Sequence, residues 1–274
     1  MTGYVALGEP RIRALRWCLA LCVCVMGLTA AWRSLNYEDS LFSYLFMDCR
    51  WPEADALLVT RSAAWLMVAA SLAALWRRAW PALVLVPCWL TVLSVCDMGQ
   101  FPPHRWLIPG ERAVRIIGPL ALAMLVAFPT DGRVAGYRER WAVQALRLAA
   151  ALTFGFHGVA ALLHTGAFLD YIFVAADSLL GVQLEQATVE WILNAIGVAD
   201  LIVAVALFSG STRVQLLAAG YMAAWGFITA ASRTVHSGLD GLPDTLVRAP
   251  NGGVPLALLL YWACSLRRPP ATPR

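Results

Sequence analysis

The chain has no lysine: all 21 of its basic residues are arginines. This absence excludes a Schiff-base lysine and a lysine general base from any chemistry of the chain. Charged residues of both signs are scarce, at 14% of 274 residues, whereas ordinary soluble domains contain about a quarter. Hydrophobic residues make up 60%. The composition therefore indicates a membrane protein.

Motifs of common enzyme and metal sites are missing as well. The seven cysteines include no CxxC pair, and Cys18, Cys22 and Cys24 lie in one apolar run, where small soft side chains pack well. This spacing does not predict a metal site. The chain also lacks a dinucleotide fingerprint, a nucleophile motif and paired histidines at the spacing of a haem-binding bundle. No nucleic-acid partner is expected.

Eight apolar runs are predicted to cross the bilayer as helices, which makes the fold class all-α and the chain a polytopic membrane protein. The first run, residues 14–32, corresponds to about 28 Å of helix and ends at the interfacial pair Trp32 and Arg33. No small-x-small cleavage pattern closes it, so a retained span is expected rather than a signal peptide. Residues 34–56 are expected to form a short helix and loop on the membrane surface. The expected spans are residues 14–32, 57–76, 80–98, 113–128, 145–163, 189–208, 214–232 and 252–266.

The chain repeats itself at two separate places. The triplet Ala14 to Arg16 recurs as Ala145 to Arg147, and each copy leads into an apolar run. The run from Arg112 to Leu122 matches that from Arg248 to Leu258, with the arginine and a Pro-Leu-Ala-Leu in register. The agreement of both anchors in order predicts two tandem four-helix repeats, and four spans per copy make the repeat parallel. The expected units are residues 1–132 and 133–274, joined by the connector 129–141.

Arginines and acids divide unequally between the two sides that this topology defines. The side that carries both termini and the connector has thirteen arginines and three acidic residues. The opposite side has eight arginines and thirteen acids, and Asp200 lies within a span. The positive-inside rule then predicts cytoplasmic termini for a multi-pass protein of the cell's inner (plasma) membrane.

Two ionisable residues lie deep in the second half. His157 is about 15 Å and Asp200 about 12 Å from the cytoplasmic ends of their spans, so antiparallel neighbours would bring them together. Because an ionisable group at that depth costs at least ~2.5 kcal/mol unless it is paired or hydrated, a hydrogen bond between them is expected. The pair is either a catalytic proton relay or quinone-headgroup site, or a structural pair that sets helix register. The first half has Met26 and Gly27 where the second has His157 and Gly158. The second half is therefore predicted to carry the functional site and the first half to support it structurally.

A second polar group is expected near the outer face. For Asp240 and Asp244 a role as solvated loop residues is favoured. Arg112, Arg115 and Arg248 each begin a span, where arginine either snorkels to phosphate headgroups or clamps an anionic ligand. Snorkelling is favoured for Arg115, and Arg248 is kept as a site residue. The candidate cofactor-binding residues are His164, Arg233, His236, Arg248 and Asn251.

The second half resembles the DoxX family of four-helix bacterial membrane proteins. The resemblance rests on Arg147, on the pair His157-Gly158, on the segment Gly197 to Asp200 and on the Arg-x-x-Asn-Gly-x-x-Pro-Leu-Ala of Arg248 to Ala257. The family has glutamate where this chain has Asp200. In the first half, the LIPGERAVR of Leu107 to Arg115 is also similar to HTTM domains related to vitamin K-dependent carboxylases.

The DoxX resemblance implies a membrane subunit of a quinone-linked redox system, because the family takes its name from subunits of a thiosulfate–quinone oxidoreductase. The alternative is a non-catalytic scaffold or assembly subunit of a larger membrane complex. A small-molecule transporter is the third hypothesis, which the repeat favours although no span is expected to be broken. The expected partners are the lipid bilayer and other membrane-complex subunits, and the only cofactor considered is a quinone. Cys49 and Cys96 are expected on the outer side, where a disulfide and two free thiols both stay open.

Overall fold

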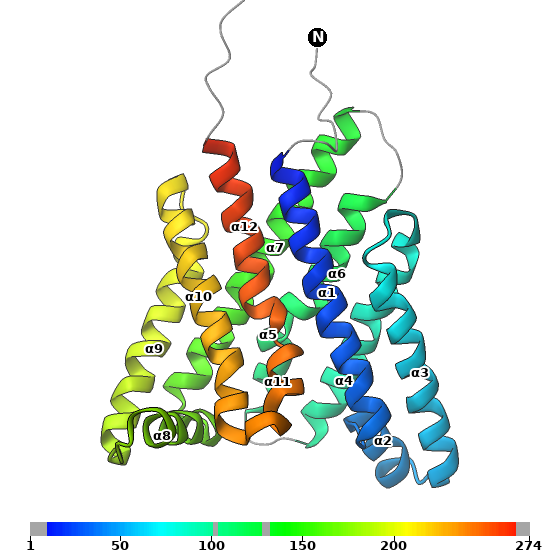
Figure 1. Cartoon of the computed structure of the whole chain (residues 1–274), viewed down its shortest axis with the longest axis vertical. Helices are drawn as coiled ribbons and strands as arrows, with labels where there is room; N and C mark the ends of the chain where they lie inside the picture. The colour runs from blue at the N-terminus through cyan, green and yellow to red at the C-terminus, as the bar shows by residue number, and fades with distance from the viewer. Residues whose placement is uncertain (1–9, 101–103, 128–131, 267–274) are drawn as a thin grey trace, which may run out of the picture.

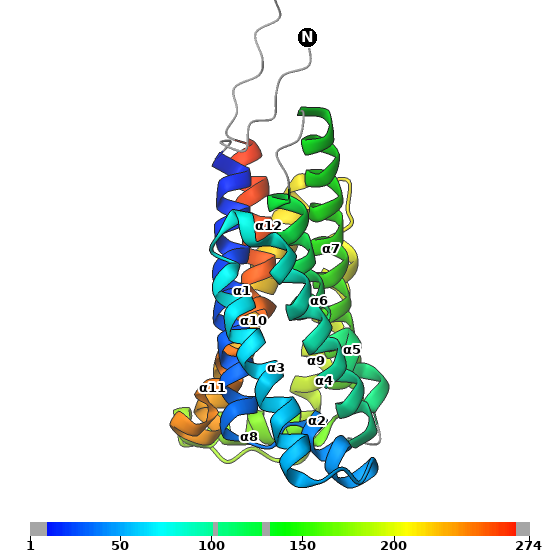
Figure 2. The same ribbon diagram turned by 90° about the vertical axis from the view of Figure 1, so that its right-hand side faces the viewer.

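The computed structural model describes residues 10–100, 104–127 and 132–266, and these residues form an all-α protein (Figure 1). The long helices run beside one another, and short helices gather at one end of the molecule (Figures 1 and 2). Residues 1–9 and 267–274 at the two termini and residues 129–131 of the expected connector lie outside the described residues. The helices are α1 (Pro10–Asn36), α2 (Ser40–Ser43), α3 (Glu53–Ala73), α4 (Leu85–Gln100), α5 (Ile108–Glu111), α6 (Ala113–Val126), α7 (Gly132–Leu162), α8 (Gly166–Leu180), α9 (Gln186–Ala206), α10 (Thr212–Ser237), α11 (Leu242–Leu246) and α12 (Ala249–Leu266).

Six helices in the described part of the chain are long and apolar enough to cross a membrane, and the chain is a multi-span helical membrane protein. Two expected spans differ. α6 has only 14 residues, and α12 has 18 but opens with Pro250, Asn251 and Gly252, which make its start less apolar. Eight spans therefore stay a prediction. The six candidate spans are Pro10–Asn36, Glu53–Ala73, Trp80–Gly99, Gly136–Leu162, Gln186–Ala206 and Thr212–Leu246.

The segment between α7 and α9, expected as a semi-polar loop, is largely the helix α8. Its apolar residues recur at helical spacing, and Gly181 ends it in the left-handed conformation, with φ of 65°. α8 lies across the ends of the long helices rather than along them (Figure 1). It therefore closes one end of the space between α7, α9 and α10.

α6 and α12 are each preceded by a short helix and a break. Arg112, with φ −99° and ψ 5°, separates α5 from α6, and the turn at Val247 and Arg248 separates α11 from α12. A proline opens each short helix, where its missing N–H is not needed. Both breaks fall before the expected spans 113–128 and 252–266 begin, so they interrupt neither of these spans. Each break places an arginine beside the first turn of a long helix.

The core lies around α6 and α12. α1 packs against α3, α6 and α12, and α7 packs against α6, α9 and α12, while α10 packs mainly against α12. Leu15, Met26, Leu122 and Leu258 are among the fully buried side chains. In a bilayer such close packing, rather than removal from water, holds helices together. α1 begins and α12 ends at the same end of the molecule (Figures 1 and 2); which side of a membrane this end faces stays a prediction.

Candidate functional site

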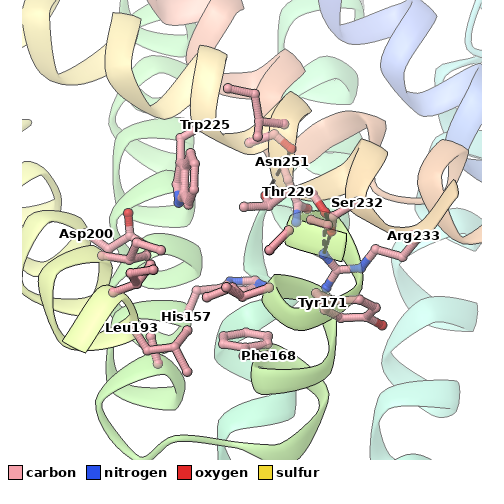
Figure 3. A pocket seen from close by; sticks show the side chains of 18 of the residues that line it. His157, Phe168, Tyr171, Leu193, Asp200, Trp225, Thr229, Ser232, Arg233 and Asn251 are labelled. Atoms are coloured by element: carbon pink, nitrogen blue, oxygen red, sulfur yellow. Dashed lines mark hydrogen bonds between the residues drawn. The ribbon is translucent and has the colours of Figure 1, made fainter. Parts of the chain in front are cut away.

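A cavity of about 430 Å³ lies between α7, α8, α9, α10 and α12 (Figure 3). Most of its lining is aliphatic or aromatic, and Phe168, Tyr171 and Trp225 supply three aromatic side chains. A mostly apolar cavity of this size with a few polar groups is typical of sites for small organic molecules. The polar lining residues are Thr153, His157, Asp200, Thr229, Ser232, Arg233 and Asn251.

His157 reaches the cavity from α7. Its Nδ1 is 2.7 Å from the carbonyl oxygen of Thr153 one turn earlier, and because a carbonyl only accepts, Nδ1 carries a proton. In a neutral ring Nε2 is then an acceptor. The imidazole lies parallel to the ring of Phe168, with centroids 6.0 Å apart, so a residue of α8 covers one face of it (Figure 3).

Thr153 also joins α7 to the start of α6. Its hydroxyl oxygen accepts a hydrogen bond from the N–H of Val114 at 3.1 Å and donates to the carbonyl of Gly110 at 3.4 Å. The carbonyl of the same residue holds His157. The orientation of the histidine is thus tied to the packing of α7 against the broken segment before α6.

Asp200 lies on α9 and is 3% exposed. Its Oδ1 accepts a hydrogen bond from the Tyr221 hydroxyl of α10 at 3.2 Å, and Tyr221 stacks against Trp225 at a centroid distance of 6.5 Å. A single neutral donor leaves a buried carboxyl with further hydrogen-bonding capacity on its cavity side.

The expected hydrogen bond between His157 and Asp200 is not formed, although both residues line the same cavity. The residue that faces Asp200 is Gly158: a Cβ built on it would lie 3.2 Å from the Asp200 Cβ and 2.9 Å from the Gly197 carbonyl oxygen. Successive helical residues point about 100° apart, so His157 is turned away from α9 and toward the cavity. The close glycine contact between α7 and α9 therefore places the two polar groups in one cavity without joining them.

Arg233 of α10 lines the opposite side of the cavity and is 8% exposed. It donates to the carbonyl oxygen of Thr229 and to the Ser232 hydroxyl, the latter at 3.0 Å. Its guanidinium carbon lies 4.2 Å from the centre of the Tyr171 ring, a cation–π contact. Its Nε is buried without a hydrogen-bond partner in the described part of the chain.

The other four predicted site residues lie in four different places. Asn251 lines the same cavity and accepts a hydrogen bond from Nε of Arg115 at 3.4 Å. His164 lies at the end of α7, with φ 48° and its Nε2 3.0 Å from Oδ1 of Asn194. His236 is exposed beside Ser237 and the Tyr171 ring. Neither histidine lines this cavity, and Arg248 belongs to a second one.

Four aromatic residues of the site were missed by sequence reasoning: Phe168, Tyr171, Tyr221 and Trp225. The first two lie on α8, where Phe168, Ile172 and Ala176 recur every four residues, a spacing that indicates a helix. Trp225 lies within the expected span 214–232, and no local pattern shows that its side chain faces the cavity. No sequence signal shows that Tyr221 meets Asp200, because that contact depends on how α9 and α10 pack.

The second cavity, of about 340 Å³, is polar and lies where α1, α2, α4, α6 and α11 meet, beside the turn before α12. Four arginines and four acids line it. Arg115, expected to snorkel to the membrane surface, is instead 7% exposed and lies inside the molecule. Its span begins beside the start of α12, where its Nε donates to Oδ1 of Asn251. The charged lining residues are Arg33, Glu38, Asp39, Asp97, Arg112, Arg115, Asp244 and Arg248.

The described residues contain neither a cluster arranged to bind a metal ion nor a disulfide between Cys49 and Cys96. No group of three or more His, Cys, Asp or Glu side chains within residues 10–100, 104–127 and 132–266 is arranged to hold a metal ion. Cys49 and Cys96 are both free thiols. Comparison of the chain with known protein families, curated proteins and solved structures finds no match.

Proposed function

We propose that the chain binds a lipid-soluble quinone in the 430 Å³ cavity of its second half, as the membrane subunit of a quinone-linked redox system of the DoxX type. The observation that carries the proposal is the combination of an apolar cavity with His157 and Asp200 on its walls. A quinone head is a flat ring with carbonyl oxygens at opposite edges. It needs aromatic surfaces to stack on and proton donors and acceptors at the rim.

The cavity has an apolar approach as well as polar walls. Leu180 of α8, Ile192 of α9 and Ile228 of α10 line it and are at the same time exposed on the outside of the molecule. In a membrane these side chains meet lipid. A quinone with an isoprenoid tail can therefore reach the cavity from the bilayer and leave its tail among apolar side chains.

Quinone reduction takes up two protons for every two electrons. Asp200 and His157 are the titratable groups placed to exchange protons with the carbonyl oxygens of a bound ring. The electrons come from a partner subunit in this proposal. The role of this chain is to hold the ring, to exclude water and to pass protons.

The tandem repeat belongs to the same proposal. Three observations support it: α1 packs against α3 as α7 packs against α9, and α1 meets α12 as α7 meets α6. Arg115 and Asn251, which occupy equivalent places after Arg112 and Arg248, form a hydrogen bond with each other. Equivalent residues meet in this way at the axis between two related halves.

Purified full-length protein in nanodiscs, titrated with short-chain ubiquinone, tests quinone binding through quenching of tryptophan fluorescence. We expect saturable quenching, part of which disappears in Trp225→Phe. Asp200→Asn and His157→Gln should raise Kd about tenfold or more, because hydrogen bonds to charged groups contribute about 1.5–3 kcal/mol. The control Asp177→Asn changes an exposed carboxylate of α8 and should leave Kd unchanged. Quenching that does not saturate, or that is the same in all four variants, contradicts the proposal.

The second candidate, a scaffold subunit, is favoured by the outer face of α3. Arg61 is exposed there eight residues into a candidate span, and Trp65 is exposed one turn further on. Lipid is a poor environment for an arginine in mid-span, whereas a partner helix with a polar or acidic residue suits it. Arg61→Leu should then release a membrane partner that co-purifies with the wild type in mild detergent. An unchanged complex contradicts the scaffold role of this face.

A further inference from the structure

The second cavity contains a buried positive charge with no acid to balance it. Arg115 of α6 is 7% exposed, and its one hydrogen bond goes to the neutral amide oxygen of Asn251. No carboxylate of the described residues forms an ion pair with it. Arg248, Arg112 and Arg233 are close enough to act on its charge, and the carboxylate of Glu111 opposes them only in part. An arginine in such a place is expected to have an anionic partner.

The acids that pair with the other arginines of the cavity do not provide a partner for Arg115. Arg112 pairs with Asp97, but Arg33 and Arg248 share the single carboxylate of Asp244, at 2.5 and 3.4 Å. The Nε of Arg248 is also buried without a hydrogen-bond partner in the part of the chain that the structure describes. The ion pairs around the cavity therefore involve two carboxylates and three of the four arginines, and Arg115 is the arginine left without one.

Two further acids lie on the α2 side of the cavity. Glu38 is exposed, and Asp39 uses Oδ1 to cap α2 by accepting from the N–H of Phe42 at 2.9 Å. Neither forms an ion pair with an arginine of the described residues. These carboxylates balance the formal charge of the lining, but neither of them pairs with Arg115.

The backbone adds to the positive character of the arginine side. α6 and α12 both begin at this cavity, directly after the two breaks. The first turn of a helix presents unbonded N–H groups and the positive end of the helix dipole, which together favour an oxyanion. The N–H of Val114 is already used by Thr153, and the N–H groups of Arg115 and Asn251 are used by the carbonyl oxygens of Arg112 and Arg248. The side chains therefore carry most of the interaction.

We propose that this cavity is a phosphate-binding site, in which Arg115 and Arg248 hold the phosphate group of a lipid headgroup or of a free phosphate ion. A phosphate carries one to two negative charges, and the planar guanidinium of arginine fits its oxygens in a bidentate manner. The site is separate from the quinone cavity: the hydrogen bond between Arg115 and Asn251 stands between the two. The proposal does not depend on quinone binding.

Thermal unfolding of the full-length protein in dodecyl maltoside tests the site with two probes. The first is inorganic phosphate, compared with chloride at the same ionic strength, and the second is phosphatidylglycerol added to the micelles. A probe at about a hundred times its Kd should raise the unfolding midpoint by about 5 °C. A shift with phosphate alone identifies a free-ion site, and a shift that requires phosphatidylglycerol identifies a lipid headgroup site.

Variants show whether the shift comes from this cavity. Arg115→Gln and Arg248→Gln should lose it, Arg115→Lys should keep only part of it, and the control Arg213→Gln, at an exposed arginine of α10, should keep all of it. If Arg115→Gln does not fold, Arg248→Gln and Arg115→Lys give the same information. The proposal is wrong if neither probe shifts the wild-type midpoint beyond chloride, or if Arg248→Gln and a folded Arg115→Gln keep the full shift.

Discussion

The helix pair α1 and α3 and the helix pair α7 and α9 both make close contact at a glycine but hold different side chains there. In the first pair Gly27 meets Met67 and Ser71; in the second Gly158 meets Gly197 and Asp200. Counted from the start of their helices, Met67 and Asp200 are both the fifteenth residue. The residue before the glycine is Met26 in α1 and His157 in α7.

The difference concerns packing as much as polarity. Met26 and Met67 are fully buried members of the core, so the first half fills with flexible side chains the space that the second half leaves open. The second half also has α8, a 15-residue helix across its end, where the first half has the four-residue α2. A helix contact of this kind therefore forms a cavity only where small and polar residues replace the methionines and a helix such as α8 covers the end.

The correspondence between the two helix pairs requires a parallel repeat. Reporter tags that show the side of the membrane on which a residue lies test this repeat with a yes-or-no outcome. Reporter tags at residue 1, in the connector 129–141 and at residue 274 should all report cytoplasm, whereas a tag near residue 240 should report the opposite side. The tags at the termini and in the connector control one another, since all three share one side. A cytoplasmic report from residue 240 contradicts both the eight-span topology and the comparison.

Replacing Met67, the counterpart of Asp200, with aspartate should have the largest effect on stability. Met67→Asp places in the first half a carboxylate that has no tyrosine to donate to it and no cavity to hydrate it. We expect a loss of about 3–5 kcal/mol, as for other unpaired buried charges. Urea unfolding in detergent measures it, and Met47→Asp, at a methionine that is 72% exposed, is the control. Equal stability of the two variants shows that the first half is not packed as described.

Adding a side chain at the helix crossing should have the next largest effect. A Cβ on Gly158 would lie 2.9 Å from a backbone carbonyl that cannot move aside, so Gly158→Val should cost about 1–3 kcal/mol. Gly155→Val is a matched control, because the same substitution one turn earlier on α7 meets nothing within 4 Å. Thermal melts of both variants should therefore separate clearly. Coincident melts contradict the close contact of α7 and α9.

Making the second half resemble the first should have the smallest effect on stability. His157→Met removes one hydrogen bond, to the helix's own backbone, and we expect a change of about 1 kcal/mol or less. Ligand binding is a sharper measure: the variant should lose the quinone quenching of the wild type. Met26→Leu, a volume-conserving change in the first half, should leave the quenching intact. Retained quenching in His157→Met means that His157 has a structural role only.

The sequence was sufficient to predict the membrane class, the long helices and four of the residues that line one cavity. His157 and Asp200 stood out because ionisable groups are rare and expensive within apolar runs. Arg233 and Asn251 were predicted from their nearness to a span end, and two other residues predicted in the same way were less well placed. His164 and His236 lie outside both cavities, because depth along a helix says nothing about the direction in which a side chain points.

Composition and the length of the apolar runs predicted an all-α, multi-span membrane protein, because a long apolar helix satisfies its backbone hydrogen bonds within itself in lipid. Tertiary structure alone decided which way the polar residues face. A rotation of 100° per residue turns His157 into the cavity and Gly158 against Asp200. The breaks before α6 and α12 bury Arg115 beside Asn251 instead of leaving it at the membrane surface. Such outcomes depend on how helices far apart in the chain pack, which no local pattern encodes.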